Sequence, residues 1–333
     1  MIWQTPQAAV DELQIQFGQQ IAYGESNGLV RFPDLRRDSD LVLAADYSGD
    51  HQSSGYQLLT FLLADRPGVL SEWESERISI RNKYLDDGRR HAFKSLNDAQ
   101  RQKALVPFLK ASSRINGVLL CVAIDKEMAA SNLGYSVGDP SAFKPRVLAK
   151  LTQVALFGSL LVSGLATTGQ NLMWLTDEDE IVSNEQSQIE AGNVIGCLLD
   201  RMCPFGMPKI QLGIAGKFDD GRRAEDLCAI PDLVGGAVAE CLTSIDKLGI
   251  PRSTNIVTPT LKRQKMKTNI IHSWFSTLDG PLSGMLCLVR PHESGVLLSF
   301  ANPGLTLGDA GVARLWLPPD KSDEKWQRSS KAW

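Results

Sequence analysis

The 333-residue sequence lacks the short motifs that identify several large classes of enzyme. No two of its six cysteines are spaced as C-x-x-C, so a zinc site of the usual spacing is not expected. It contains no G-x-x-x-x-G-K-[ST] loop and no G-x-G-x-x-G, which argues against a P-loop or dinucleotide-binding fold. With only four histidines and no G-x-S-x-G elbow, serine-hydrolase chemistry also has no support.

The sequence also lacks a large excess of charge and a long apolar run. Its 35 basic and 38 acidic residues give a net charge of -3, whereas proteins that coat nucleic acid non-specifically are far more basic. The longest nearly apolar run, 154–166, is too short to span a bilayer and suits a buried helix. No basic stretch followed by an apolar one opens the sequence, and cysteines such as Cys121 lie inside apolar runs. We therefore expect a cytoplasmic protein with no membrane partner.

Short apolar runs alternate with longer helical patterns, which is typical of an α/β fold. We expect strands at 41–45, 56–63, 117–124, 171–175 and 209–214, and helices at 69–85, 99–113, 143–168, 188–202 and 224–248. The predicted organisation is an N-terminal helical segment (1–40), a core (41–250), a C-terminal β-rich extension (251–319) and a polar tail (320–333). An apolar hairpin at 284–300 could bind a partner protein or a second copy of the chain.

Three of the expected strands end in an aspartate, namely Asp46, Asp125 and Asp177. Ligands of open α/β sheets bind beyond the carboxyl ends of the strands, and neighbouring strands lie about 4.8 Å apart. Carboxylates at adjacent strand ends can therefore share one cation. The alternative for each residue is an ordinary turn, because an aspartate side chain accepts hydrogen bonds from the backbone that follows it.

A fourth aspartate, Asp232, lies in an apolar helical segment next to Gly235-Gly236, which would let a helix lie close against another element. A carboxylate on an apolar helix face is costly to bury unless it is paired or binds a metal. The alternative is that Asp232 caps the amino end of a helix. The residues alone leave both interpretations open.

Four motifs in this order resemble those of the DUF3800 family: ADYSGD at 45–50, VAIDK at 122–126, LTDE at 175–178 and IPDLVGG at 230–236. That family is assigned to the ribonuclease H-like superfamily. The resemblance covers about residues 40–247 and implies a mixed sheet flanked by helices, with an acidic cluster that binds Mg²⁺ or Mn²⁺.

The resemblance also implies a role for each aspartate. Asp46 would bridge two metal ions, Asp177 and Asp232 would each hold one, and Asp125 would complete the site or orient water. Hard divalent cations prefer carboxylate oxygens, and two of them about 3.5–4 Å apart can activate water and stabilise the leaving oxygen of a phosphodiester.

The chain departs from the family pattern at three places. Tyr47 stands where the family usually has glutamate, and residues 229–231 replace its usual Q-L-A. The stretch 90–94, RHAFK, lacks the carboxylate that the family often carries before its first long helix. Asp50, Glu178 or the softer ligand His91 would have to take that place.

Basic residues near these motifs are the expected phosphate contacts. They are Lys126, Lys217, Arg222, Arg223, Lys262, Arg263, Lys265 and Lys267. The run at 262–267 is the densest basic patch, although such runs are more often solvated linkers. The resulting hypothesis is a metal-dependent nuclease or phosphodiester hydrolase. The alternative is a catalytically weak relative that binds nucleic acid or protein within a larger assembly.

Overall fold

The computed structural model describes residues 2–4, 12–26, 30–48, 54–70, 72–128, 133, 140, 142–218, 221–249, 265–278, 280–292 and 295–301. In chain order the helices and strands are α1 (Glu12–Ser26), β1 (Asp40–Ser48), β2 (Tyr56–Asp65), α2 (Arg66–Leu70), α3 (Glu72–Tyr84), α4 (Ala99–Ser112), β3 (Gly117–Asp125), α5 (Pro145–Leu165), β4 (Asn171–Thr176), α6 (Glu185–Met202), β5 (Ile210–Ile214), α7 (Arg223–Lys247), α8 (Met266–Ser276), β6 (Leu282–His292) and β7 (Gly295–Ala301). Three 3₁₀ turns accompany them: η1 (Leu35–Arg37), η2 (Phe93–Ser95) and η3 (Ala215–Lys217).

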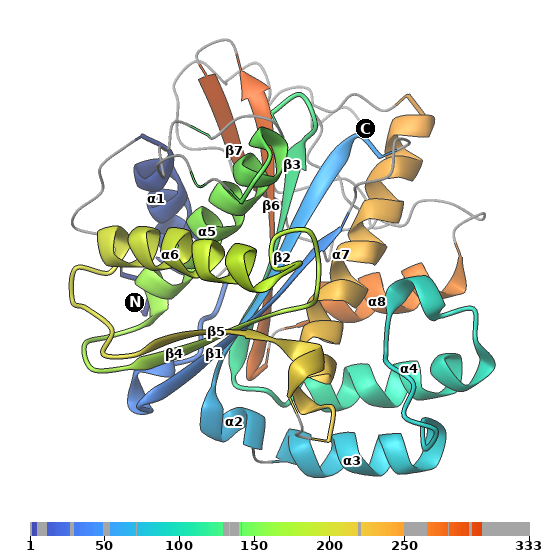
Figure 1. The fold of residues 1–333 in the computed structure, drawn as a ribbon. Helices are drawn as coiled ribbons and strands as arrows, with labels where there is room; N and C mark the ends of the chain where they lie inside the picture. The colour runs from blue at the N-terminus through green and yellow to red at the C-terminus, as the bar shows by residue number, and fades with distance from the viewer. Residues whose placement is uncertain are drawn as a thin grey trace.

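The described strands form one seven-stranded mixed sheet in the order β5-β4-β1-β2-β3-β6-β7 (Figure 1). Strand β2 is antiparallel to both of its neighbours, β1 and β3. Strand β4 pairs in parallel with β1 and with β5, and β6 pairs in parallel with β3. The carboxyl ends of β1, β3, β4 and β5 therefore lie at the same edge of the sheet. The predicted α/β class and the predicted β1–β2 hairpin are confirmed.

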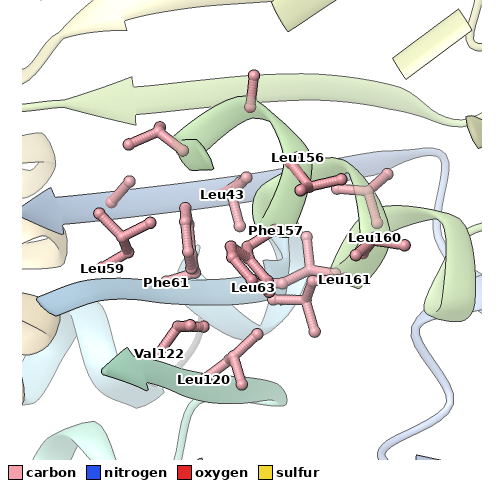
Figure 2. Close-up of a cluster of buried hydrophobic side chains, with 14 of the residues drawn as sticks. Leu43, Leu59, Phe61, Leu63, Leu120, Val122, Leu156, Phe157, Leu160 and Leu161 are labelled. Carbon is pink, nitrogen blue, oxygen red and sulfur yellow. The ribbon is translucent and has the colours of Figure 1, made fainter. Parts of the chain in front are cut away.

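One face of the sheet is covered by α1, α5 and α6. Figure 2 shows Leu43, Phe61 and Leu120 from the three central strands packed against Phe157 and Leu161 of α5. All five side chains are fully buried, and each contributes about 1.5–3 kcal/mol to stability by leaving water. Because both faces of β1, β2 and β3 are covered, these strands have the continuous apolar sequences from which they were predicted.

The opposite face is covered by α3, α4, α7 and α8. Side chains that alternate with those of the first face, such as Ala44 and Leu58, pack here against Ile230 and Leu233 of α7. A buried ionic network connects α3 to α7. Asp226 has no exposed surface and accepts hydrogen bonds from Arg81 Nε (2.5 Å) and Nη2 (2.6 Å) and from Arg77 Nη1 (2.9 Å).

The two predicted terminal segments are parts of this fold. Strand β6 joins β3 in parallel, so the C-terminal hairpin continues the central sheet. Helix α1 packs near β7. Gln20 Nε2 donates to the carbonyl of Leu298 (2.8 Å), and the ring centroids of Phe17 and Phe300 are 5.4 Å apart. Helix α8 was not predicted, and it places a helix in the segment expected to be β-rich. Residues 302–333 lie outside the described part.

Helices α5 and α7 are long and apolar enough to cross a membrane by length and composition alone. Both are mostly buried inside the fold, as α5 illustrates in Figure 2. Their apolar character is therefore accounted for by packing against the sheet.

A glycine in α5 tests this packing. A Cβ on Gly158 would lie 2.2 Å from the buried Trp174 ring, whereas a Cβ on Gly192 of α6 would meet nothing within 4 Å. We expect Gly158→Ala to destabilise the protein by about 1–3 kcal/mol through overpacking. The matched Gly192→Ala should be neutral or stabilise by up to about 1 kcal/mol, since alanine favours helix. Urea unfolding of both variants measures the difference, and equal stabilities would contradict the packing described here.

Candidate functional site

The ends of β1 and β4 bring Asp46 and Asp177 together. In the parallel pairing, Ala44 lies opposite Leu175 and Ala45 opposite Thr176, so Asp46 and Asp177 are the next residues at the same level. Ala44 and Leu175 both belong to the core beneath α7. Because side chains alternate along strands, Asp46 and Asp177 project to that same face. This juxtaposition is the one that the sequence predicted from the strand ends.

Helix α7 supplies Asp232 from above the sheet. A Cβ on Gly235 would lie 2.8 Å from Ser48 Oγ and 2.9 Å from Thr60 Oγ1, so the helix backbone rests directly on β1 and β2. A Cβ on Gly236 would lie 2.3 Å from the Phe93 ring. The two glycines therefore provide the close approach expected of them.

Asp232 lies within α7, far from its amino end at Arg223. The helix-cap alternative for Asp232 is therefore wrong. Its Oδ2 instead accepts a hydrogen bond from the backbone N–H of Phe93, at 2.6 Å. The segment around η2 is in this way attached to the carboxylate.

We call the group formed by Asp46, Asp177, Asp179 and Asp232 the acid cluster. Burial, followed by the neighbouring charges of Asp232, Asp177 and Asp179, raises the pKa of Asp46 well above its usual range. Burial also raises the pKa of Asp232. Oδ2 of Asp46 is buried and has no hydrogen-bond partner among the described residues. The cluster thus concentrates negative charge around an oxygen of Asp46 that solvent does not reach, while Asp177 at its edge is about 40 % exposed.

Asp179 was not predicted as part of this site. Its Oδ1 accepts a hydrogen bond from the backbone N–H of Ile181 (2.9 Å), and burial raises the pKa of its carboxyl group. Only the path of the loop distinguishes Asp179 from the exposed Glu178 and Glu180.

Asp125 lies away from the acid cluster. Asp46 is level with Thr60 of β2, and Thr60 is level with Cys121 of β3. Asp125 is four residues further along β3, or roughly 13 Å at the usual rise of a strand. Its Oδ1 accepts a hydrogen bond from the backbone N–H of Glu127 (3.0 Å), as expected of a turn-forming aspartate.

The residues considered as substitutes for a missing carboxylate do not join the cluster either. His91 is buried and stacks on Phe108 with 4.0 Å between ring centroids. Its nearest charged groups are Asp226, Arg81 and Arg101, rather than the acid cluster. Glu178 is exposed, and Asp50 lies outside the described residues.

Arg90 and Lys150 are two of the cations that act on the acid cluster. Arg90 Nη2 donates to Asp177 Oδ1 at 2.6 Å, and its Nε lies 3.0 Å from Glu225 Oε1. Lys150 is nearly buried, bonds Glu180 at 3.1 Å, and interacts electrostatically with Asp46 and Asp179. Sequence patterns gave no signal for either residue, because each reaches the site from an element of its own.

Several of the predicted phosphate contacts that the structure describes have partners within the protein. Lys267 Nζ donates to the carbonyl of Phe93 (2.8 Å) and interacts electrostatically with Asp232, which places it nearest to the acid cluster. Arg222 pairs with Glu225, Arg223 lies 3.9 Å from Glu74, and Lys265 lies 3.2 Å from Glu240. Lys217 is exposed on η3, and Lys126 follows Asp125, away from the cluster. Lys262 and Arg263 lie outside the described residues.

Within the described part of the chain, no three histidine, cysteine, aspartate or glutamate side chains are close enough to form a metal centre as they stand. The acid cluster is therefore a concentration of charge in which two of the carboxylates are already held by other groups. Arg90 holds Asp177, and the Phe93 N–H holds Asp232.

No family model matches this sequence, and no curated protein matches it.

The charge repulsion in the cluster predicts that a neutral residue at position 46 is more stable. We expect Asp46→Asn to raise stability by about 0.5–2 kcal/mol near neutral pH with EDTA present, the usual size of a stabilising substitution. Asp125→Asn is the control, since Asp125 is outside the cluster, and it should not stabilise. Denaturant unfolding of both variants makes the comparison. A loss of stability in Asp46→Asn would show that the carboxylate is satisfied in the native protein.

Burial lowers the pKa of His91 to about 4, so its protonation should oppose folding. Since the unfolded chain binds this proton near pH 6.5, the wild type should lose stability as pH falls from 6.5 toward 4. The loss attributable to His91 is at most about 3 kcal/mol. His91→Phe, which keeps a ring against Phe108, should lack that part of the loss. Urea unfolding at pH 7, 5.5 and 4 measures it, and parallel curves for the two proteins would contradict the assignment.

Proposed function

We propose that this chain hydrolyses phosphodiester bonds of nucleic acid with divalent metal ions held by Asp46, Asp177 and Asp232. The observation that carries this proposal is the convergence of the three carboxylates, with a buried oxygen of Asp46 that lacks a partner among the described residues. Strongly perturbed carboxyl groups of this kind concentrate at functional sites.

The sheet supports a ribonuclease H-like core, as the resemblance to the DUF3800 family implies. That fold has three consecutive antiparallel strands and two further strands that pair in parallel beside the first. The order β5-β4-β1-β2-β3, with β2 antiparallel, agrees with that arrangement. In this proposal β6 and β7 extend the core at its other edge.

The donor set fits Mg²⁺ or Mn²⁺, because all three side chains offer hard carboxylate oxygens. Burial and the neighbouring carboxylates raise the pKa of Asp46, and a cation would offset both effects. Of the roles expected from the resemblance, those of Asp46, Asp177 and Asp232 are retained in the proposal. Asp125 was expected to complete the site, but it is left out of the proposal because the register of β3 places it away from Asp46.

When bound, such ions would polarise the phosphodiester and supply a nucleophilic water. The protein would contribute the remaining electrostatics. Lys150 would balance the charge of Asp46 and Asp179, and Lys267, with the exposed Lys94 near Asp232, would receive the phosphate backbone. A cytoplasmic setting and a nucleic-acid partner, rather than a membrane, belong to the same proposal.

A second candidate is a catalytically weak relative that binds nucleic acid, a protein partner or a second copy of the chain. Two observations favour it: Asp177 is already paired with Arg90, and no ready metal centre exists among the described residues. Metal binding distinguishes the two candidates, because only the enzyme depends on it.

A metal titration followed by a cleavage assay tests the proposal. We expect Mn²⁺ or Mg²⁺ to raise the Tm of the wild type, since a ligand at 100 times its Kd stabilises by about 2.7 kcal/mol. The Tm of Asp46→Asn should not respond. Metal-dependent cleavage of single- or double-stranded DNA or RNA should fall at least about 100-fold in that variant.

Asp125→Asn is the matched control, because it removes the same charge at the end of another strand of the sheet, β3. It should keep the metal response and the cleavage activity. An equal loss in both variants would place Asp125 in the site. A wild type that responds to neither metal would exclude the enzyme and favour the binding role.

A further inference from the structure

The Arg90 side chain connects Asp177, at the end of β4, with Glu225, in the first turn of α7. Nη2 of the guanidinium donates to Asp177 Oδ1, and Nε faces Glu225 Oε1. The Arg90 and Asp177 side chains are each about 40 % exposed, so this contact lies at the surface of the cluster. Arg90 also interacts electrostatically with Asp232. Arg90 thus pairs directly with one proposed metal ligand, Asp177, and acts on a second, Asp232, through its charge.

The main chain of Arg90 is anchored independently of this contact. Its carbonyl accepts a hydrogen bond from Arg101 Nε at 2.7 Å. Arg101 is fixed in turn at the start of α4, where its backbone N–H donates to Asp98 at 3.0 Å. The guanidinium can therefore leave Asp177 by side-chain rotation alone, with Glu225 as its remaining partner.

The carboxylate of Asp177 already accepts hydrogen bonds from two partners. Its Oδ1 accepts from Arg90 and also from the backbone N–H of Glu178, at 3.0 Å. A divalent ion on Asp177 would lie beside the positive guanidinium. Repulsion between two cations a few ångströms apart is substantial near a protein surface.

We propose that Arg90 is an internal cation that competes with the divalent metal for Asp177 and so sets the metal affinity of the site. This inference rests on the proposed function, because it assigns a role to Arg90 at the same acid cluster. It also explains why the carboxylates converge without forming a ready metal centre: one of them is held by an arginine. Metal binding then requires the release of Arg90 toward Glu225.

The opposite role for Arg90 is to position Asp177 for the metal. The two roles predict opposite signs. If Arg90 competes, its removal tightens metal binding. If it positions Asp177, its removal weakens metal binding.

Mn²⁺ titration followed by the electron paramagnetic resonance signal of the free ion measures this sign without any assay of activity. We expect Arg90→Gln to bind Mn²⁺ about tenfold more tightly than the wild type, since one nearby positive charge is removed. Arg90→Lys, which keeps the charge, should stay within about threefold of the wild type.

Arg222→Gln is the matched control. Arg222 is a similarly exposed arginine that pairs with the other oxygen of Glu225, and Asp177 is not among its partners in the described part of the chain. Its substitution should leave the affinity for Mn²⁺ unchanged. A tenfold gain in both Arg90→Gln and Arg222→Gln would reflect overall charge and overturn the specific role of Arg90.

The remaining outcomes separate this inference from the proposed function. If the wild type binds Mn²⁺ and Arg90→Gln binds it equally or more weakly, the competition is wrong while the metal site stands. If neither protein binds Mn²⁺, both the competition and the metal-dependent function are excluded. Far-ultraviolet circular dichroism of each variant establishes that it is folded.

Discussion

The contact of α7 with β1 and β2 is the constraint on which the acid cluster depends. Gly235 lets the helix backbone approach the hydroxyl groups of Ser48 and Thr60, and Gly236 accommodates the ring of Phe93. This close approach places the carboxylate of Asp232 near those of Asp46 and Asp177 at the strand ends. The packing that closes this side of the core therefore also gathers like charges in a poorly solvated place, and such an arrangement requires positive charge from elsewhere.

The fold treats two buried carboxylate groups differently, that of Asp226 on α7 and that of Asp46 on β1. Asp226 is fully buried, and Arg77 and Arg81 supply three hydrogen bonds to it. A buried carboxylate so well paired is a structural connection between helices. Asp46, in contrast, retains a buried oxygen without a partner among the described residues. Because Asp232 is on the same helix as Asp226, the contrast does not reflect a general lack of basic side chains near α7.

The sequence was informative where local patterns determine the structure. Continuous apolar runs identified β1 to β4, and the parallel pairing of β1 with β4 made Asp46 and Asp177 neighbours as predicted. Asp125 could not be placed correctly, because the register of β3 depends on its pairing with β2 and not on where its apolar run ends. The roles of Asp179 and Arg90 depend on the paths of loops, which follow no periodicity. Helix α8 was missed because its residues were assigned to the β-rich extension, on the short apolar runs that follow it.

The charge distribution also bears on the choice between catalysis and binding. A module that only binds nucleic acid gains from exposed cations, yet several of the predicted cations are paired with carboxylates, as Arg222 is with Glu225 and Lys265 with Glu240. A cluster of buried carboxylates repels a phosphate backbone unless a cation lies between them. Arg90 supplies one positive charge, but it pairs with Asp177. An oxygen of Asp46 remains without a hydrogen-bond partner among the described residues. Under the proposed function, further positive charge must therefore enter the acid cluster from solution, and a divalent cation is the simplest source of that charge.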